Sequence, residues 1–487
     1  MKENGPFRAR VILMVGCLSI AVGSVRLQAL AQQAAEPGSR PNIIFIVTDQ
    51  QSAYMISCTG NKWLKTPAMD YIAKNGIRFE RAYTTNPVCC PARIGFMTGR
   101  FPGTFASSAG APVRENGGGM RVTRTPPEVH DTHVAAYLKG AGYELAYAGK
   151  VHLPKPLAPK QLGFDVLTAD SREMGARASA EFIKREHRRP YYLWVNFINP
   201  HDICYFAIND YRFNPPTEQG KTGRGGVANR ALLEAMRVPD GVSEEEFFAK
   251  HCPPLPANHQ PQDDEPQALK RLIDQRGFRR HARQTYGEKD WRLHRWAYHR
   301  LTERVDRQIG IVLDALRESG QEENTVVIFT SDHGDNDAAH KMEHKTALYE
   351  ESARIPMLVM HKAAAPGGRV DDTHLVSNGL DLLPTVCDYA GIPDAKADPR
   401  GRSLRPLIEG KTVKNWRETL GVESEIGRMV VGDRVKYIKY DMGTKQEQLL
   451  DLNKDPGETR HFTAAPEYAE ILERLRASYN DEWFPDN

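Results

Sequence analysis

Short, mainly apolar runs recur along the chain, and polar residues capable of catalysis follow each of them. Four such runs cover 43–47, 143–148, 192–197 and 325–330. Continuous apolar runs of this length are typical of strands that are buried on both faces of a sheet. The pattern therefore predicts a buried strand at each of these four places.

The segments between these runs carry helical spacing. Over 298–316 apolar residues recur every three or four positions, and Gly320 follows the last of them. This spacing places the apolar side chains on one stripe of a helix, and glycine is a common helix end. Further helices are predicted over 68–75 and 134–139. Because strands alternate with helices, we expect an α/β fold with a large, mostly parallel central sheet flanked by helices.

The pattern changes past about residue 394. Apolar and polar residues over 429–440, around a Gly-Asp turn, and over 449–452 predict short antiparallel strands. The stretch 468–479 has the spacing of an amphipathic helix. We therefore expect a small C-terminal antiparallel sheet plus a helix. We expect the chain to divide into a main domain, 41–394, which contains a variable insertion, 203–290, and a C-terminal subdomain, 395–487.

The N-terminus has the composition of an export signal. Basic residues precede an apolar stretch over 11–25, and small residues suited to cleavage follow at 29–31. We expect 1–31 to be a signal peptide and the protein to be exported, to a periplasmic or extracellular location. Lipid anchoring at Cys17 is the less favoured alternative, because the apolar stretch continues past that cysteine.

Composition argues against several classes of protein. The formal net charge is only +3, so no strong field favours nucleic acid. No later stretch approaches the roughly 20 apolar residues of a membrane span. The seven cysteines are scattered, which does not suit a disulfide framework. We expect no nucleic-acid partner and no stable membrane span, and the oligomeric state stays open.

The run Cys-Cys-Pro-Ala-Arg, from Cys89 to Arg93, carries the most specific chemistry in the chain. Pro91 suits the first turn of a helix, and Arg93, four residues after Cys89, falls on the same helix face. Unpaired N–H groups at a helix N-terminus and a guanidinium both favour negative charge. The sequence therefore predicts an environment for an anion at position 89.

Two of the predicted strands end in ligands for a hard metal ion. Asp49 and Gln50 follow the first apolar run, and Asp332 and His333 follow the last. Each of these is also an ordinary turn or cap residue when taken alone. Because the carboxyl ends of parallel strands meet at one edge of a sheet, we expect the four to converge. Oxygen ligands suit Ca²⁺ or Mg²⁺, and the histidine leaves Mn²⁺ open.

Several motifs together resemble the type I, formylglycine-dependent sulfatases of the alkaline phosphatase-like superfamily. They stand in the order of that family: Asp49 with its neighbour, CxPxR at 89–93, GKxH at 149–152, Pro-His at 200–201, DHG at 332–334, and Lys345. The resemblance implies an alkaline phosphatase-like fold, with 41–394 as the catalytic domain. It also implies hydrolysis of a sulfate ester, which we expect to be carried by a sulfated carbohydrate.

The resemblance further implies a role for each matched side chain. Cys89, rather than Cys90, would be oxidised by a formylglycine-generating maturation enzyme to 3-oxoalanine, whose hydrate attacks sulfur. The metal, Ca²⁺ with Mg²⁺ or Mn²⁺ as alternatives, would be held by Asp49, Gln50, Cys89, Asp332 and His333. For the remaining residues, Arg93 would steady the nucleophile, Lys150 and Lys345 would hold sulfate oxygens, His152 would relay the diol proton, and His201 would protonate the leaving alcohol.

Two departures from the family pattern keep alternatives open. Gln50 stands where many sulfatases have a second aspartate, and Ala92 stands where many have serine. Gln50 removes a negative charge from the metal site, which keeps a phosphonate monoester or phosphodiester hydrolase in consideration. If Cys89 stays a thiol, a non-catalytic binder of sulfated glycans is expected instead.

Two other stretches receive structural interpretations. The basic cluster Arg279, Arg280, His281 and Arg283 could bind a polyanionic glycan, but the solvated face of an inserted helix is favoured. The glycines at 117–119 are expected in a loop. We assign no chemical step to His340 or His344.

Overall fold

The computed structural model of the protein describes residues 40–211 and 226–485. Residues 41–487 form one compact unit. The predicted signal peptide, 1–31, and the alternative lipid-anchor site, Cys17, lie outside the described residues.

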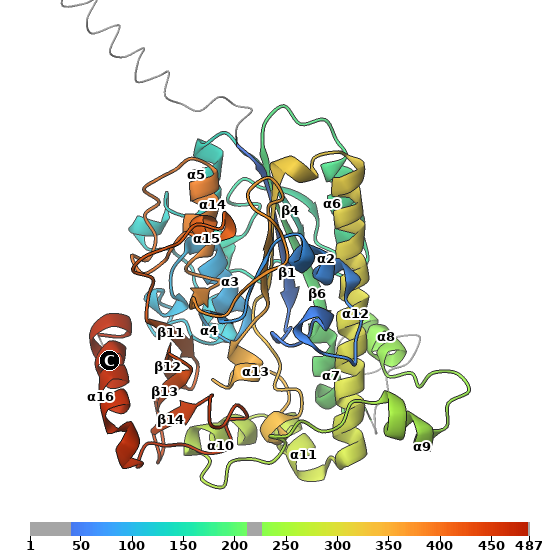
Figure 1. Ribbon diagram of the computed structural model, residues 1–487, viewed down its shortest axis with the longest axis vertical. Coiled ribbons are helices and arrows are strands. Elements are labelled where there is room, and N and C mark those ends of the chain that lie inside the picture. The colour runs from blue at the N-terminus through green and yellow to red at the C-terminus, as the bar shows by residue number, and fades with distance from the viewer. Residues whose placement is uncertain (1–39, 212–225, 486–487) are drawn as a thin grey trace, which may run out of the picture. The chain divides into compact units, whose positions relative to one another are not determined.

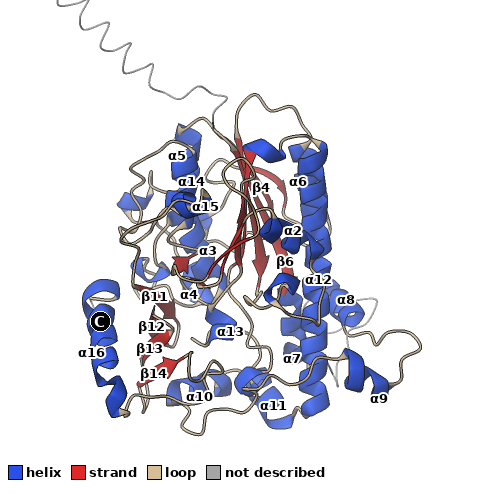
Figure 2. Cartoon of the chain, viewed as in Figure 1, coloured by secondary structure: helices blue, strands red, loops and turns tan. Residues whose placement is uncertain are grey.

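An eight-stranded sheet runs through this unit (Figure 2). The strand order is β5-β4-β6-β1-β7-β8-β2-β9, and all neighbours pair parallel except that β8 is antiparallel to β7 and β2. The prediction of a mostly parallel sheet is therefore confirmed. The strand bounds are β1 Asn42–Asp49, β2 Ile77–Phe79, β4 Glu144–Gly149, β5 Asp165–Thr168, β6 Tyr191–Pro200, β7 Thr325–Ser331, β8 Met357–Met360 and β9 Arg369–Asp371. A separate pair is formed by β3 (Ala82–Tyr83) and β10 (Val376–Ser377).

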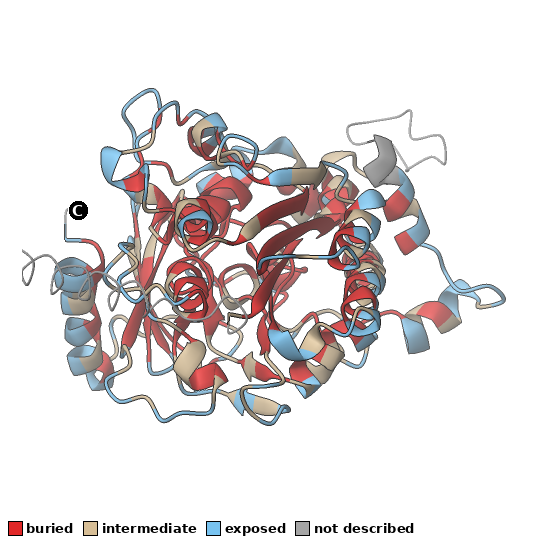
Figure 3. Ribbon diagram, turned by 90° about the horizontal axis from the view of Figure 1, so that it is seen from above, coloured by how far each residue is buried: buried red, intermediate tan, exposed pale blue. Residues whose placement is uncertain are grey.

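Strand β1 shows why the central runs are apolar at nearly every position. Ile43, Phe45 and Val47 pack into one hydrophobic cluster, whereas Ile44 and Ile46 pack into another. Successive side chains of a strand point to opposite faces, so a sheet covered on both faces needs apolar residues throughout. The central strands are accordingly buried along their length (Figure 3).

Helices cover both faces of the sheet (Figure 1). The cluster that includes Ile44 also contains side chains of α2 (Pro67–Lys74), α6 (Met174–Ile183) and α12 (Glu288–Glu318). The cluster that includes Phe45 contains side chains of α3 (Cys89–Thr98), α5 (Val134–Gly140) and α14 (Leu382–Tyr389).

Helix α12 begins ten residues before the predicted start at 298. Asp290 accepts a hydrogen bond from the Gly287 N–H (2.7 Å), which satisfies an otherwise unpaired donor at the helix start. Trp291 and Ala297 extend the buried stripe of the helix into a cluster formed with the insertion. The first turns of α12 are therefore stabilised by packing against the insertion, and the apolar pattern over 298–316 gives no indication of these contacts.

The insertion contributes mainly helices. These are α7 (Cys204–Ile208), α8 (Gly226–Ala235), α9 (Glu244–Glu246), α10 (Gln267–Asp274) and α11 (Gly277–Thr285).

The expectation of a loop at 117–119 is wrong, because these glycines lie in the short helix α4 (Asn116–Met120). A Cβ at Gly119 would come within 2.6 Å of Cys90 Sγ, so glycine permits this helix to pack closely against α3.

The predicted C-terminal antiparallel sheet and helix are confirmed. Strands β11 (Thr419–Ser424), β12 (Gly427–Gly432), β13 (Val435–Tyr440) and β14 (Glu447–Asp451) pair antiparallel in that order. Helix α16 (Ala469–Ala477) contacts β13. Two short helices, α13 (Glu350–Ala353) and α15 (Arg405–Ile408), complete the helices named in Figure 1.

Candidate active site

Neighbouring strands deliver the predicted ligands to one edge of the sheet. Strand β1 lies between β6 and β7, with Thr48 opposite Ser331 and Asp49 at its end. Asp332 and His333 follow β7 directly. Asp49, Cys89, Asp332 and His333 are buried, and each offers a ligand atom within 4.8 Å of the other three. Asp49, Asp332 and His333, which follow β1 and β7, therefore converge as expected from a parallel sheet, and Cys89 joins them from the start of α3.

Cys89 is the first residue of α3, and its side chain lies inside this group. Its Sγ is 3.0 Å from both His333 Nε2 and Lys345 Nζ, and 3.5 Å from Asp49 Oδ1. Burial and the Asp49 carboxylate raise the pKa of the thiol, but the cations around it outweigh them and hold that pKa well below its usual value. Position 89 thus favours a negatively charged atom.

Cys90 belongs to a different environment. Its side chain lies in the hydrophobic cluster with Ile94 and Phe96, and burial raises the pKa of its thiol to about 12. The two adjacent cysteines therefore face a charged site and an apolar core, respectively.

Arg93 joins the two buried carboxylates. Its Nε donates to Asp332 Oδ2 (3.0 Å), its Nη2 to Asp49 Oδ2 (3.3 Å) and its Nη1 to Asn196 Oδ1 (2.8 Å). Burial and the charge of Asp49 raise the pKa of Asp332 to about 6. Asn196 was missed by the sequence analysis, although a polar residue inside the apolar run 192–197 could have indicated it.

The two lysines contact different members of the group. Lys150, which follows β4, forms an ion pair with Asp49 Oδ2. Lys345 lies in the loop after β7 and donates to Gln50 Oε1 (2.9 Å) as well as contacting Cys89. Although burial raises the pKa of Asp49, the charges of Lys150 and of other nearby cations hold it well below its usual value. Asp49 is therefore a carboxylate at neutral pH.

Both polar atoms of the Gln50 side chain have hydrogen-bond partners. Its Oε1 lies 3.1 Å from the Cys204 Sγ donor and also accepts from Lys345, while its Nε2 donates to Asp335 Oδ2 (2.6 Å). Its backbone N–H donates to Asp332 Oδ1 (3.1 Å). Asp335 and Cys204 were not predicted. Asp335, three residues after Asp332, could have been suspected from its loop, whereas nothing in the sequence distinguishes Cys204.

The two histidines predicted to transfer protons follow β4 and β6. Burial and the charge of Lys345 lower the pKa of His201 well below its usual value, so its ring is uncharged at neutral pH. The Nδ1 atoms of His201 and His152 are buried and have no hydrogen-bond partner within 40–211 and 226–485. Neither histidine forms a hydrogen bond with Cys89 in that part of the chain.

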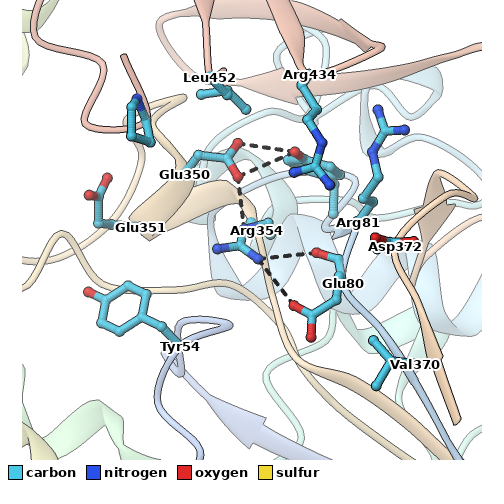
Figure 4. A pocket seen from close by; sticks show the side chains of 12 residues that line it. Tyr54, Glu80, Arg81, Glu350, Glu351, Arg354, Val370, Asp372, Arg434 and Leu452 are labelled. Carbon is cyan, nitrogen blue, oxygen red and sulfur yellow. Dashed lines mark hydrogen bonds and ion pairs between the residues drawn. The ribbon is translucent and has the colours of Figure 1, made fainter. Parts of the chain in front are cut away.

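A cavity of about 540 Å³ lies elsewhere, between the main sheet region and the C-terminal sheet (Figure 4). Among its charged lining residues, Arg354 pairs with Glu350 (2.8 Å) and with Glu80 (3.9 Å). No residue predicted for metal binding or catalysis lines this cavity. We therefore place the chemistry at the Cys89 group.

Comparison with known proteins identifies the family. Residues 41–392 match the sulfatase family, and residues 338–482 match the C-terminal region of N-sulphoglucosamine sulphohydrolase. The chain belongs to the sulfatase family. It is thus a sulfuric ester hydrolase with an alkaline phosphatase-like fold, and the resemblance seen in its motifs is confirmed.

Relatives of this sulfatase align over most of its length. The Delta 4,5-hexuronate-2-O-sulfatase of Bacteroides thetaiotaomicron is 27% identical over 482 residues, which cover 93% of this chain and 91% of the relative. A solved structure of a 2-O GAG sulfatase is 26% identical, with a TM-score of 0.74 and 91% of each chain covered. The phosphonate monoester hydrolase of Agrobacterium radiobacter, 20% identical with a TM-score of 0.65, covers 90% of this chain and 95% of its own, and shares the fold.

Within the described residues of the enzyme, no helix is long and apolar enough to cross a membrane.

Proposed function

We propose that this sulfatase hydrolyses a sulfate ester of a sulfated carbohydrate, using a formylglycine formed from Cys89 and a divalent metal ion. The observation that carries the proposal is the position of Cys89 Sγ, 3.0 Å from Lys345 Nζ and 3.0 Å from His333 Nε2, beside Asp49 and Asp332. A side chain placed there has both a cation and carboxylate ligands next to its reactive atom.

The residues present fit a hard divalent cation. Two buried carboxylates lie side by side, and the pKa of one of them, Asp332, is raised to about 6 by burial and by the charge of its neighbour. A divalent ion would neutralise this repulsion, and oxygen ligands suit Ca²⁺, with Mg²⁺ or Mn²⁺ as alternatives. Asp49, Asp332, His333, the side chain at 89 and the Gln50 carbonyl would hold the ion. When bound, it would polarise the oxygens of the sulfate group.

Position 89 is a thiol in the unmodified chain and stands where the hydrated aldehyde of formylglycine would act. That group, produced by a maturation enzyme, supplies a hydroxyl nucleophile and a second hydroxyl for release of sulfate. Arg93 holds Asp49 and Asp332 in fixed positions beside it. The guanidinium therefore orients the carboxylates around the nucleophile.

The two lysines would bind sulfate oxygens. Lys345 Nζ already contacts Cys89 Sγ and the side chain of Gln50, so an anionic sulfate near position 89 gains a buried cation. Lys150 forms an ion pair with Asp49, so it can contact sulfate only if that pair weakens, as it would when a metal ion binds the carboxylate.

Proton transfer is assigned to His201 and His152, each of which has a buried Nδ1 with no hydrogen-bond partner among the described residues. His201 would protonate the leaving alcohol, and His152 would relay the proton of the nucleophile. A negatively charged substrate would raise the pKa of His201 from its depressed value, because the charged ring is then stabilised.

Names of relatives support a sugar substrate. They include a hexuronate-2-O-sulfatase and an N-acetylglucosamine-6-O-sulfatase, both from Bacteroides thetaiotaomicron.

The test compares hydrolysis of sulfated monosaccharides with hydrolysis of a phosphonate monoester and a phosphodiester. We expect the sulfate esters to have the higher kcat/KM. A preference for the phosphorus esters would contradict the proposal and favour the alternative hydrolase activity.

We further propose that the enzyme is exported and that residues 1–31 are removed. N-terminal peptide sequencing of protein from its native source checks this, and an intact N-terminus would contradict it.

A further inference from the structure

Arg279, on α11, is a buried guanidinium that forms no ion pair with an acid among residues 40–211 and 226–485. The residue is 5% exposed, so the expectation that the basic cluster lies on a solvated helix face is wrong for this member. Its Nη2 donates to the backbone carbonyl of Lys345 (3.2 Å). Its Nε and Nη1 are buried and have no hydrogen-bond partner in the described part of the chain. Burying such a charge costs free energy unless a partner compensates it.

Neighbouring arginines show what a purely structural guanidinium does here. Arg283, one turn further along α11, pairs with Glu265 (2.8 Å). Glu425 is the acid whose charge most favours the cationic form of Arg279, but its ion pair is with Arg276 (3.7 Å). Among these arginines, Arg279 thus differs in having two guanidinium nitrogens, Nε and Nη1, with no hydrogen-bond partner in the described residues.

Arg279 lies beside the residues that surround position 89. It bonds the main chain of Lys345, whose Nζ is 3.0 Å from Cys89 Sγ. The ring of His344 packs on Phe278, with centroids 4.8 Å apart. Two consecutive residues of α11 therefore contact two consecutive residues of the loop after β7.

Nearby acids offset the charge of Arg279 only in part, and none of the described residues forms an ion pair with it. Burial and the charge of Arg276 lower the pKa of Arg279, but only to about 10, so the side chain is a cation at neutral pH. His344 does not offset this charge either: burial and the charge of Arg279 hold the pKa of its ring well below the usual value, so the ring is neutral. By contrast, Arg93 is held between Asp49 and Asp332.

We propose that Arg279 binds a second anionic group of the substrate, a carboxylate or another sulfate carried next to the sulfate ester that is cleaved. The proposal rests on the proposed sulfatase function. A guanidinium whose Nε and Nη1 have no hydrogen-bond partner among the described residues suits an oxyanion, to which it can donate charge-assisted hydrogen bonds. The substrate class is then a sugar with at least two negative groups, and Arg279 selects it against esters that carry the cleavable sulfate alone.

The test measures kcat/KM for Arg279→Met and Arg279→Lys on three substrates. These are 4-nitrophenyl sulfate, a sulfated uronic acid and a disulfated glucosamine. On the sugar whose second anion is bound, we expect Arg279→Met to lower kcat/KM by roughly 30-fold or more, as for loss of one partner of a buried charge pair. On 4-nitrophenyl sulfate, the kcat/KM of this variant should stay within about threefold of the wild-type value. Arg279→Lys should fall between wild type and Arg279→Met, since it keeps the charge but not the planar set of guanidinium donors.

The sugar that loses activity shows whether the second group is a carboxylate or a sulfate. Arg280→Met is the matched control, since Arg280 is the next residue on the same helix and is exposed. It should behave as wild type on all three substrates. Equal losses for Arg279→Met on all three would overturn the proposal and leave Arg279 as a positioning residue for Lys345. Unchanged activity on all three would overturn it as well.

Stability separates this role from a structural one. Because Arg279→Met removes an uncompensated buried charge, its thermal midpoint without ligand should not be lower than that of wild type. A marked fall would overturn the proposal. If wild type cleaves no sulfate ester, the proposed function fails, and ligand binding then tests the role of Arg279. The sulfated uronic acid or the disulfated sugar should raise the thermal midpoint of wild type but not that of Arg279→Met, which would support the proposal for Arg279. If neither sugar shifts the midpoint of wild type, the proposal for Arg279 is overturned.

Discussion

Lys345 Nζ lies 3.0 Å from Cys89 Sγ and 2.9 Å from Gln50 Oε1, with its side chain buried. The pKa of Lys345 is raised, because the negative charges of Cys89 and nearby groups outweigh the effect of burial. The ammonium is therefore permanently charged at the position where a sulfate oxygen would lie next to the nucleophile.

Replacing Lys345 by alanine should reduce turnover without unfolding the enzyme. We expect kcat to fall by roughly 10²–10³, the scale for removal of one charge-stabilising donor. Steady-state kinetics on a sulfated sugar measure this. Lys341→Ala is the control, since Lys341 belongs to the same loop but is not a partner of Cys89. Wild-type turnover in Lys345→Ala would remove this lysine from the mechanism.

The contact of Gln50 with Asp335 makes a carboxylate at position 50 costly. Gln50→Glu would replace the Nε2 donor, which is 2.6 Å from Asp335 Oδ2, with a second acidic oxygen. Two buried carboxylates at that distance cannot both stay charged, so we expect a loss of about 1–3 kcal/mol in the free energy of unfolding.

Combining Gln50→Glu with Asp335→Asn should recover most of that loss, because the asparagine amide can donate to the new carboxylate. Thermal or urea unfolding of the two single variants and the double variant gives the coupling energy. Additive losses would show that the Gln50 to Asp335 hydrogen bond does not determine the stability of this loop.

Removal of divalent cations should lower both activity and thermal midpoint. The carboxylates of Asp49 and Asp332 repel each other when no ion is bound, and a ligand at 100 times its Kd stabilises a protein by about 2.7 kcal/mol. Chelation followed by separate addition of Ca²⁺, Mg²⁺ or Mn²⁺, with calorimetry and activity as the readouts, identifies the ion.

The variant Asp332→Asn should lose most of the thermal shift that the restoring ion produces. Asp306→Asn should keep it, because Asp306 is a buried acid that bonds the N–H groups of Ala68 and Met69 at the start of α2 and lies outside the ligand group. An undiminished shift in Asp332→Asn would place the ion elsewhere.

Acidification should destabilise the enzyme through His299. The Nε2 of His299 lies 3.2 Å from Asn61 Nδ2, and the Nδ1 of His299 donates to the Arg295 carbonyl (2.6 Å). The neutral ring therefore satisfies both contacts. Burial and the charge of Arg295 lower the pKa of His299 to about 3, compared with about 6.5 in an unfolded chain. Between these values the unfolded state binds the extra proton, so stability is complete above about pH 6.5 and falls as the pH drops toward 3.

This histidine alone should contribute about 1.4 kcal/mol per pH unit to that fall. Denaturant unfolding at several pH values measures it, and His299→Gln should show a shallower dependence by this amount. His130→Gln, at an exposed histidine, is the control. Identical pH profiles for wild type and His299→Gln would contradict the assignment.

The sheet and the ligand group were predictable from local patterns. A strand buried on both faces needs a continuous apolar run, and parallel strands bring their carboxyl ends together. These two rules are sufficient to bring Asp49 near Asp332, because the register sets Thr48 opposite Ser331. The position of Cys89 followed from a motif whose first residue starts a helix.

Arg279 shows what local patterns did not reveal. Arg279 and Arg280 are adjacent in one basic stretch, yet one is buried and the other exposed. Their difference comes from packing of α11 against the loop that contains His344 and Lys345, which are distant in sequence. Ala282, three residues after Arg279 and also buried, was the one local hint of a buried helix face.

The chemical state of residue 89 tests the central claim most directly. Protein purified from its native source can be digested and the peptide that contains Cys89 analysed by mass spectrometry, with an aldehyde-reactive probe as a second readout. We predict an aldehyde at position 89, in proportion to the specific activity on a sulfated sugar. A fully active preparation in which residue 89 is still a thiol would contradict the account.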